Sequence, residues 1–223
     1  QWARGNLALA SKALGDLAGA RELEEKVLEL FSRTLPDDHP DVQWARLNLA
    51  ATIKMQGDLA GARSLEEKIL EIFSRTFPDD HPALQAARGN LAATIKMQGD
   101  LAGGRALEEQ VLEVQSRKLP EDHPDLQAAR MNLAVTMYAQ GDFAGARALL
   151  EQVLEVYSRT LPDDHPDLAR ARLNLAVTIK AQGDLAGARA LEEKVLEVFS
   201  RTLPDDHPDL AKARLNLAGT IEA

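Results

Sequence analysis

The sequence predicts an all-α solenoid of antiparallel helix pairs, and an internal repeat is the main reason. The string Asp-Asp-His-Pro-Asp, or a close variant of it, recurs at an interval of 42 residues. A period of this size with two helical patterns per unit is typical of a solenoid, in which each repeat buries its apolar face against its neighbours. The motif accounts for all five histidines of the chain, which are His39, His81, His123, His165 and His207.

The unit that starts at Pro40 shows how the first helix of each pair is predicted. Proline suits the first helical position because its missing N–H costs nothing there, and Asp41 places a carboxylate where the helix dipole favours it. Apolar residues then recur with helical spacing, so we expect a first helix over residues 40–56. Carboxylates in the turn before it are expected to satisfy the open backbone N–H groups at the helix start.

A glycine and an aspartate separate the two helices of the pair. Gly57 tolerates the left-handed conformation that ends a helix, and Asp58 is a favourable cap for the next one. Apolar residues continue the second helix to about Thr76, where Pro78 and its flanking acids break it. The chain therefore holds about five helix pairs, with an unpaired eleventh helix at its end.

We expect one repeat domain over residues 1–223. The chain begins with Gln1 inside one repeat and ends inside another, so we interpret it as a fragment of a longer protein. The predicted units cover residues 1–39 (a partial repeat), 40–81, 82–123, 124–165, 166–207 and, as a lone first helix, 208–223.

Composition narrows the classes of function. Hydrophobic residues make up 45% of the chain and aromatic residues only 4%, so the core should consist of Leu, Ala, Val and Ile. A net charge of −9 argues against general nucleic-acid binding, which needs clustered Lys and Arg. The lack of cysteine excludes disulfides and thiolate metal sites, and no apolar run is long enough to span a membrane. We expect no cofactor, no nucleic-acid or membrane partner, and a cytoplasmic location.

The Asp-His-Pro turns are the first candidates for chemistry, since Asp37, Asp38, His39 and Asp41 all carry metal-ligating groups. A zinc site needs three or four converging ligands, whereas these residues lie in one short turn. We therefore favour a structural role at the helix start and predict that the turns bind no metal. The sequence also lacks a nucleophile elbow and a glycine-rich phosphate loop, so we predict that the protein is not an enzyme.

The run Leu-Asn-Leu-Ala-Val-Thr-Ile-Lys-Ala-Gln-Gly-Asp-Leu-Ala-Gly-Ala-Arg at residues 173–189 resembles the tetratricopeptide repeat. The residues that match the packing pattern of that family are Leu175, Ala176, Ile179, Gly183, Asp184, Ala188 and Val195. The 42-residue unit and its His-Pro-Asp start resemble the kinesin light chain variety, which is also common in bacterial multidomain regulators. The resemblance covers essentially the whole chain. It implies a right-handed superhelix of about eleven helices that binds protein partners, with the first helices lining its concave surface.

Two features depart from that family pattern. Repeat three is the least regular, with Gly103-Gly104 in place of Gly-Ala, Gln115 in place of an aromatic residue and Ala83 in place of Asp. Because each glycine within a helix costs roughly 1 kcal/mol relative to alanine, we predict that repeat three is the most mobile part of the interior. In addition, only Leu150 is apolar at a position where the family often has an aromatic residue. The other repeats carry Glu24, Glu66, Glu108 and Glu192 there.

An asparagine in the middle of each first helix is the strongest functional signal. Asparagine is a poor helix former, so its amide needs a partner. The resemblance places these side chains in the concave groove, where an amide matches the donors and acceptors of an extended peptide. The alternative is a hydrogen-bonded ladder between neighbouring first helices. The candidate peptide-binding amides belong to Asn48, Asn90, Asn132 and Asn174.

Cations recur beside these asparagines and predict a locally basic groove that steers an acidic peptide. The alternative is that each arginine pairs with a neighbouring glutamate, which stabilises only modestly. Trp2 and Trp44 are either binding anchors or covers of the terminal apolar surface. The further candidate site residues are Arg46, Arg88, Arg130, Arg172, Lys54, Lys96, Tyr138 and Lys180, and side-chain differences at Leu47, Gly89, Met131 and Leu173 predict pockets of different size.

These observations predict a non-catalytic scaffold that binds an extended, acidic peptide in its groove. One alternative is the sensor arm of a larger bacterial signalling ATPase, which a nucleotide-binding domain in the full-length protein would support. Another is head-to-tail self-association through the truncated ends, where near-identical repeats expose apolar surface.

Overall fold

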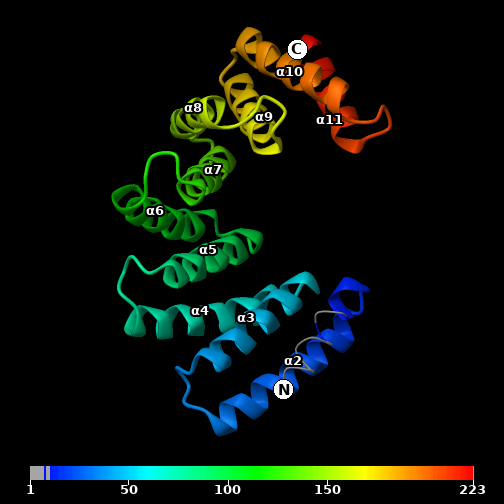
Figure 1. The fold of residues 1–223 in the computed structure, drawn as a ribbon. Helices are drawn as coiled ribbons and strands as arrows, with labels where there is room; N and C mark the ends of the chain where they lie inside the picture. The colour runs from blue at the N-terminus through cyan, green and yellow to red at the C-terminus, as the bar shows by residue number, and fades with distance from the viewer. Residues whose placement is uncertain (1–7, 9–10, 223) are drawn as a thin grey trace. The chain divides into compact units, whose positions relative to one another are not determined.

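The computed structural model describes residue 8 and residues 11–222, and the regular elements in these residues are all α-helices (Figure 1). We call the first helix of each repeat an A helix and the second a B helix. The A helices are α3 (Pro40–Met55), α5 (Pro82–Met97), α7 (Pro124–Ala139), α9 (Pro166–Ala181) and α11 (Pro208–Ile221). The B helices are α2 (Leu17–Thr34), α4 (Leu59–Thr76), α6 (Leu101–Lys118), α8 (Phe143–Thr160) and α10 (Leu185–Thr202). The predicted all-α architecture of helix pairs is confirmed, with bounds within a residue or two of those expected.

A histidine, rather than a carboxylate, caps each A helix. In α3 the Nδ1 atom of His39 accepts a hydrogen bond from the backbone N–H of Asp41 at 3.2 Å, and Pro40 occupies the first helical position. The expectation that carboxylates do this is wrong for the A helices, because the imidazole folds back over the helix start. It is right for the B helices, where the Asp58 carboxylate accepts from the N–H of Gly61 at 2.9 Å.

The turn between the helices of a pair depends on one left-handed glycine. Gly57 has a φ of +86°, which a side chain would strain. The reversal lets the N–H of Asp58 donate to the carbonyl of Ile53, closing the end of α3. Asp58 can then cap α4 at once, so a short turn joins two antiparallel helices.

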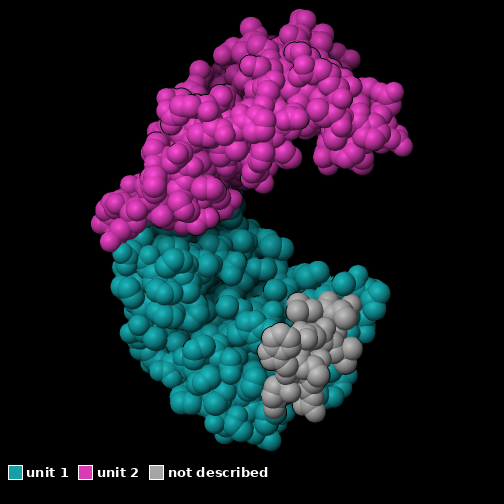
Figure 2. Space-filling model, in the orientation of Figure 1, with its two compact units in different colours: residues 1–114 teal, residues 115–223 magenta. Residues whose placement is uncertain are grey.

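Two compact units make up the chain, residues 1–114 and 115–223, and their boundary falls within α6 (Figure 2). In the first unit α2 packs on α3, α3 on α4, and α4 on α5. In the second unit each helix from α7 to α10 packs on the one that follows it, up to α11. Each unit is thus a series of consecutively packed helices, as a solenoid requires.

The same core positions recur in both units. In the first unit Ile69, Ile72 and Phe73 of α4 are buried against Leu84 and Ala87 of α5. The second unit buries Val153, Val156 and Tyr157 of α8 against Leu168 and Ala171 of α9, the residues found 84 positions later. The aliphatic core expected from composition is present, with one buried aromatic ring in each cluster and Phe77 also packed against the first.

Candidate functional site

The exposed face of α3, α5, α7 and α9 is a narrow stripe that contains the recurring asparagine. On α3 the stripe consists of Trp44, Asn48, Ala51 and Met55, whose spacing of four, three and four residues places them on one side of a helix. Trp44 is 47% exposed and Met55 61% exposed. The corresponding residues are Ala86, Asn90, Ala93 and Met97 on α5, Ala128, Asn132, Val135 and Ala139 on α7, and Arg170, Asn174, Val177 and Ala181 on α9. We call this set the outer stripe.

The asparagine amides of the outer stripe do not join neighbouring helices within residues 11–222. Asn48 donates to the backbone carbonyl of Trp44 in its own helix at 2.9 Å. The side chains of Asn90, Asn132 and Asn174 form no hydrogen bond among the described residues, and Asn90 and Asn132 are exposed. These three amides therefore have no internal partner in this part of the chain.

The four arginines hold the turn before each A helix instead of lining the outer stripe. Arg46 is 3% exposed and donates to both the carboxylate and the carbonyl of Asp37, nine residues earlier. Lys68 of α4 also approaches that carboxylate, at 3.6 Å. The equivalent ion pairs are Arg88–Asp79 at 2.6 Å, Arg130–Glu121 at 2.6 Å and Arg172–Asp163 at 2.5 Å.

These ion pairs change the titration of the turn carboxylates. Hydrogen bonding to Arg46 lowers the pKa of Asp37, since it stabilises the charged form. In the same way, hydrogen bonding to Arg130 lowers the pKa of Glu121, and hydrogen bonding to Arg172 lowers that of Asp163. The carboxylates that pair with these arginines lie in the turn before each A helix. They are not the B-helix glutamates that were the expected partners.

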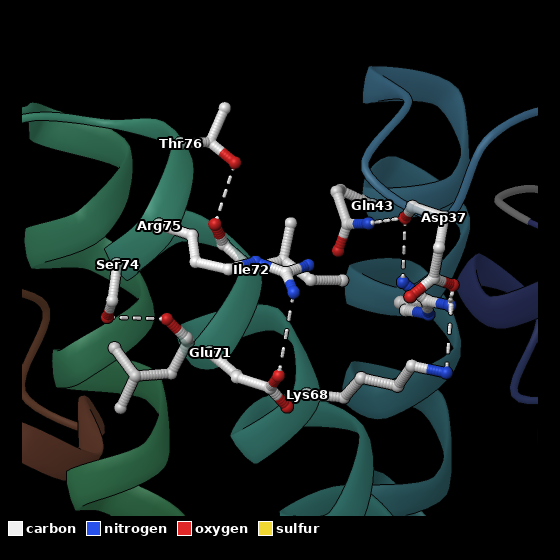
Figure 3. A network of polar contacts seen from close by, with 10 residues as sticks. Asp37, Gln43, Lys68, Glu71, Ile72, Ser74, Arg75 and Thr76 are labelled. Atoms are coloured by element: carbon white, nitrogen blue, oxygen red, sulfur yellow. Dashed lines mark hydrogen bonds and ion pairs between the residues drawn. The ribbon is translucent and has the colours of Figure 1, made fainter.

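A glutamine that we did not predict as functional completes this turn. The buried Gln43 donates its amide N–H to the carbonyl of Asp37 (Figure 3). Gln85 and Gln127 bind the turn carbonyls of Asp79 and Glu121 in the same way. The recurrence of these glutamines at 42-residue spacing was the sequence signal that could have identified them. Ala169 and Ala211 replace them in the last two A helices.

Most of the lysines expected in the groove bind buried glutamates. Lys54 of α3 lies 2.8 Å from Glu66 of α4, whose side chain is only 4% exposed, and also donates to Thr94 of α5 at 3.1 Å. Lys12–Glu24 and Lys96–Glu108 repeat the ion pair at 2.7 and 2.5 Å. Lys180 instead donates to the carbonyl of Gly219 and the hydroxyl of Thr220 in α11. These lysines connect each A helix to a B helix or to the next A helix.

Repeat four replaces this polar pair with an apolar one. Tyr138 stands at the lysine position and Leu150 at the glutamate position. Leu150 is 1% exposed, and Tyr138 packs against the cluster that contains it. The ring of Tyr138 also lies 5.3 Å from that of Phe143. The structure thus places Tyr138 half-buried in the repeat interior.

Three of the four variable positions predicted to form pockets face inward, whereas a side chain at the fourth, Gly89, would meet no atom within 4 Å. Met131 is 4% exposed, and Leu47 and Leu173 are partly buried against B helices. The prediction of groove pockets is wrong for Leu47, Met131 and Leu173, because they lie on the side of the A helix that packs against a B helix. Trp2 lies outside the described residues.

Among the described residues, no group of three or more His, Cys, Asp or Glu is placed to hold a metal ion. In the same residues no helix combines the length and the apolar character needed to cross a membrane.

Consecutive antiparallel helix pairs with a left-handed glycine between them define a helical-repeat protein. The family model of the tetratricopeptide repeat matches residues 1–75, 83–159 and 125–201, so the chain belongs to the tetratricopeptide repeat family. A search of curated proteins found no match.

Solved structures support this family. A kinesin light chain-type protein of Podosopora anserina with nearly identical TPR-like repeats is 28% identical, with a TM-score of 0.82 over 91% of this chain and 96% of that one. BtubC (BKLC) from P. vanneervenii is 19% identical, with a TM-score of 0.76 over 92% of this chain and 83% of that one. The apo form of RapI is 12% identical, with a TM-score of 0.77 over 98% and 83%. The last two similarities concern the fold alone, and the first supports the kinesin light chain-like variety.

Proposed function

We propose that the chain is a non-catalytic protein-interaction scaffold that binds an extended peptide along the outer stripe of its A helices. The family supports the general role, since tetratricopeptide repeats serve as protein-interaction modules. The observation that supports this particular surface is the set of exposed amides on Asn90 and Asn132, which have no hydrogen-bond partner in the described residues. We expect the protein to act in the cytoplasm.

Amides in the middle of a helix are suited to binding a peptide backbone. An Asn side chain offers one acceptor and two donors, which match the carbonyl and N–H groups of an extended chain. Asparagine lowers helix stability relative to alanine, so its recurrence without an internal partner favours a role in binding. Apolar neighbours such as Met97 and Val135 add side-chain contact area around these amides.

The proposed ligand is an acidic peptide. Arg46, Arg130 and Arg172 are buried and paired with carboxylates, so their charge is largely neutralised. Charge steering would have to come from the half-buried lysines, such as Lys180, whose ammonium group binds only uncharged oxygens among the described residues.

A double substitution in the outer stripe tests the proposal. Peptides selected on the native chain from a random display library serve as probes, in acidic and neutral versions. Asn90→Ala with Asn132→Ala should weaken their capture by at least roughly tenfold, the effect of losing one to two hydrogen bonds, while helicity stays unchanged.

The matched control alters the exposed face of the B helices, with Glu71→Ala and Glu155→Ala. This variant should capture the peptides as well as the native chain does. Capture that survives the asparagine change and fails with the control would contradict the proposed surface. Equal capture of acidic and neutral peptides would contradict the charge preference alone.

A further inference from the structure

The four methionines of the chain lie on A helices and fall into two pairs. Met55 and Met97 are the last residues of α3 and α5, and they are 61% and 59% exposed. Met131 and Met137 lie on α7, where Met131 is 4% exposed and Met137 is partly buried against a core cluster. The thioethers of the first pair are therefore open to solvent, whereas those of the second pair are shielded by neighbouring side chains.

The fold does not require a large side chain at the end of an A helix. Ala139 and Ala181 end α7 and α9, at the positions 84 residues after Met55 and Met97. Both α7 and α9 pack on the B helix that follows them, so alanine serves the structure at these positions. The two exposed methionines of the first unit are therefore not explained by packing.

Both exposed methionines belong to the outer stripe. Each follows an asparagine of the stripe by seven residues, or two helical turns, as Met97 follows Asn90. The two helices lie side by side, because Lys54 of α3 donates to Thr94 of α5 at 3.1 Å. Methionine is flexible and polarizable, and it adapts to irregular apolar surfaces. The stripe of the first unit thus combines asparagine amides with thioethers that a bound peptide can contact.

We propose that Met55 and Met97 are oxidation sites, and that conversion of their thioethers to sulfoxides lowers the affinity of the first unit for its peptide. The effect on affinity rests on the peptide-binding function proposed above, whereas the reaction itself depends only on the exposure of the two side chains. A sulfoxide is polar, so it replaces an apolar contact with a group that loses its hydration when the peptide binds.

The oxidant is a peroxide. A lone pair of the methionine sulfur attacks one peroxide oxygen, and an S–O bond forms as the O–O bond breaks. The displaced hydroxide then removes the proton from the transferred oxygen and leaves as water. The sulfur loses two electrons, and the peroxide gains them. Methionine sulfoxide reductases reverse the change, so the modification can act as a switch.

Treatment of the native chain with hydrogen peroxide tests the reaction. Trypsin releases Met55 and Met97 in the fragments 55–63 and 97–105, which mass spectrometry resolves from the fragment 131–147. Met55 and Met97 should oxidise at least roughly tenfold faster than Met131, because exposure governs the access of the oxidant. Helicity and the unfolding midpoint should stay unchanged when only the first pair is oxidised, since both side chains lie outside the core.

Peptide capture tests the effect on binding. Peptides selected on the reduced native chain should bind the oxidised chain about tenfold more weakly, and reductase treatment should restore their affinity. Met55→Leu with Met97→Leu keeps the apolar contact without an oxidisable sulfur, so this variant should capture the peptides normally and be insensitive to peroxide. Met131→Leu with Met137→Leu is the matched control, which leaves the exposed pair in place and should remain sensitive.

Equal oxidation rates for the exposed and buried methionines would overturn the proposal. Loss of capture in the peroxide-treated Met55→Leu and Met97→Leu variant would also overturn it, as would unchanged capture by an oxidised chain whose binding depends on Asn90 and Asn132. The function proposed above fails by a different result. Capture that survives Asn90→Ala with Asn132→Ala contradicts the outer stripe and leaves the measured oxidation rates as they are.

Discussion

Recurring polar residues have opposite environments on the two faces of an A helix: the outer stripe, and the inner face that packs against neighbouring helices. On α5 the amide of Asn90 is exposed and has no hydrogen-bond partner in the described residues, whereas Lys96 binds the buried Glu108 and Arg88 binds Asp79. The sequence pattern of the three residues is the same, since each recurs at most of the equivalent positions. A polar residue can therefore recur in every repeat for two reasons: it bonds to another residue of the protein, or it binds an external partner. The burial of its side chain distinguishes the two cases.

The largest effect is expected from breaking one buried lysine–glutamate pair. Lys54→Tyr should destabilise the protein by about 3 kcal/mol, because it leaves the carboxylate of Glu66 buried without its cation. Adding Glu66→Leu should recover most of that loss, since it reproduces the Tyr138 and Leu150 combination of repeat four. Urea unfolding monitored by circular dichroism measures both changes. A double variant no more stable than the Lys54→Tyr variant would show that the two arrangements are not interchangeable.

A smaller loss is expected at the turn arginines. Arg130→Gln should cost about 1–2 kcal/mol, since it removes charged hydrogen bonds to a carboxylate that is itself partly solvated. Arg159→Gln, a change on the exposed part of α8, is the matched control and should lie within about 0.5 kcal/mol of the native chain. Equal effects of the two changes in urea unfolding would count against a structural role for the buried arginine.

The same ion pairs predict a dependence on pH. The pKa of Asp37 is lowered in the folded chain, so its contribution to stability is complete above its ordinary value of 3.8 and is lost as the pH falls below it. Thermal unfolding of the native chain between neutral pH and about pH 3 should show this acid-side loss. An Arg46→Gln variant should show a shallower one. Identical acid-side slopes for the two proteins would rule out this contribution.

Repeat three is expected to show a smaller effect of imperfect packing on the inner face. Gly103 is not a departure, because every B helix has glycine there and its N–H binds the capping aspartate, here Asp100 at 2.8 Å. Only Gly104 replaces an alanine, and the side chain of Lys96 fills the space of the missing methyl group. Gln115 replaces an aromatic ring, and its side-chain oxygen is buried without a hydrogen bond. We expect faster hydrogen exchange in residues 99–118 than in residues 141–160, and slower exchange there would contradict this.

The smallest effect on stability is expected at the outer stripe. Asn132→Ala should leave the free energy of unfolding unchanged or raise it by about 0.5 kcal/mol, because alanine is the better helix former and no internal hydrogen bond is lost. Urea unfolding checks the sign. A loss of 1 kcal/mol or more would mean that this amide has a structural partner.

The sequence was sufficient to predict the helices but not the inner ion pairs. Periodicity, Pro40, Gly57 and Asp58 fixed the helix bounds through local chemistry. The partner of Arg46 could not be predicted, because it lies in a turn whose path hydrophobic periodicity does not determine.

The lysine–glutamate pair did leave a signal in the sequence. Lys54 and Glu66 are separated by 12 residues across a turn, and both positions change together in repeat four. That joint change to Tyr138 and Leu150 indicated contact. The exposure of Asn90 and Asn132 agrees with what the family resemblance implies, whereas the lack of a hydrogen-bond partner for their amides among the described residues could not be predicted from the sequence.

Peptide capture by two double variants tests most directly whether the outer stripe binds the partner while the inner residues only stabilise the fold. Asn90→Ala with Asn132→Ala should lose capture of the selected peptides by at least roughly tenfold while keeping the native unfolding midpoint. Lys54→Tyr with Glu66→Leu should retain capture, because it exchanges one internally satisfied pair for another. Capture lost only in the second variant would contradict the account, since the inner residues would then be the ones that bind the partner.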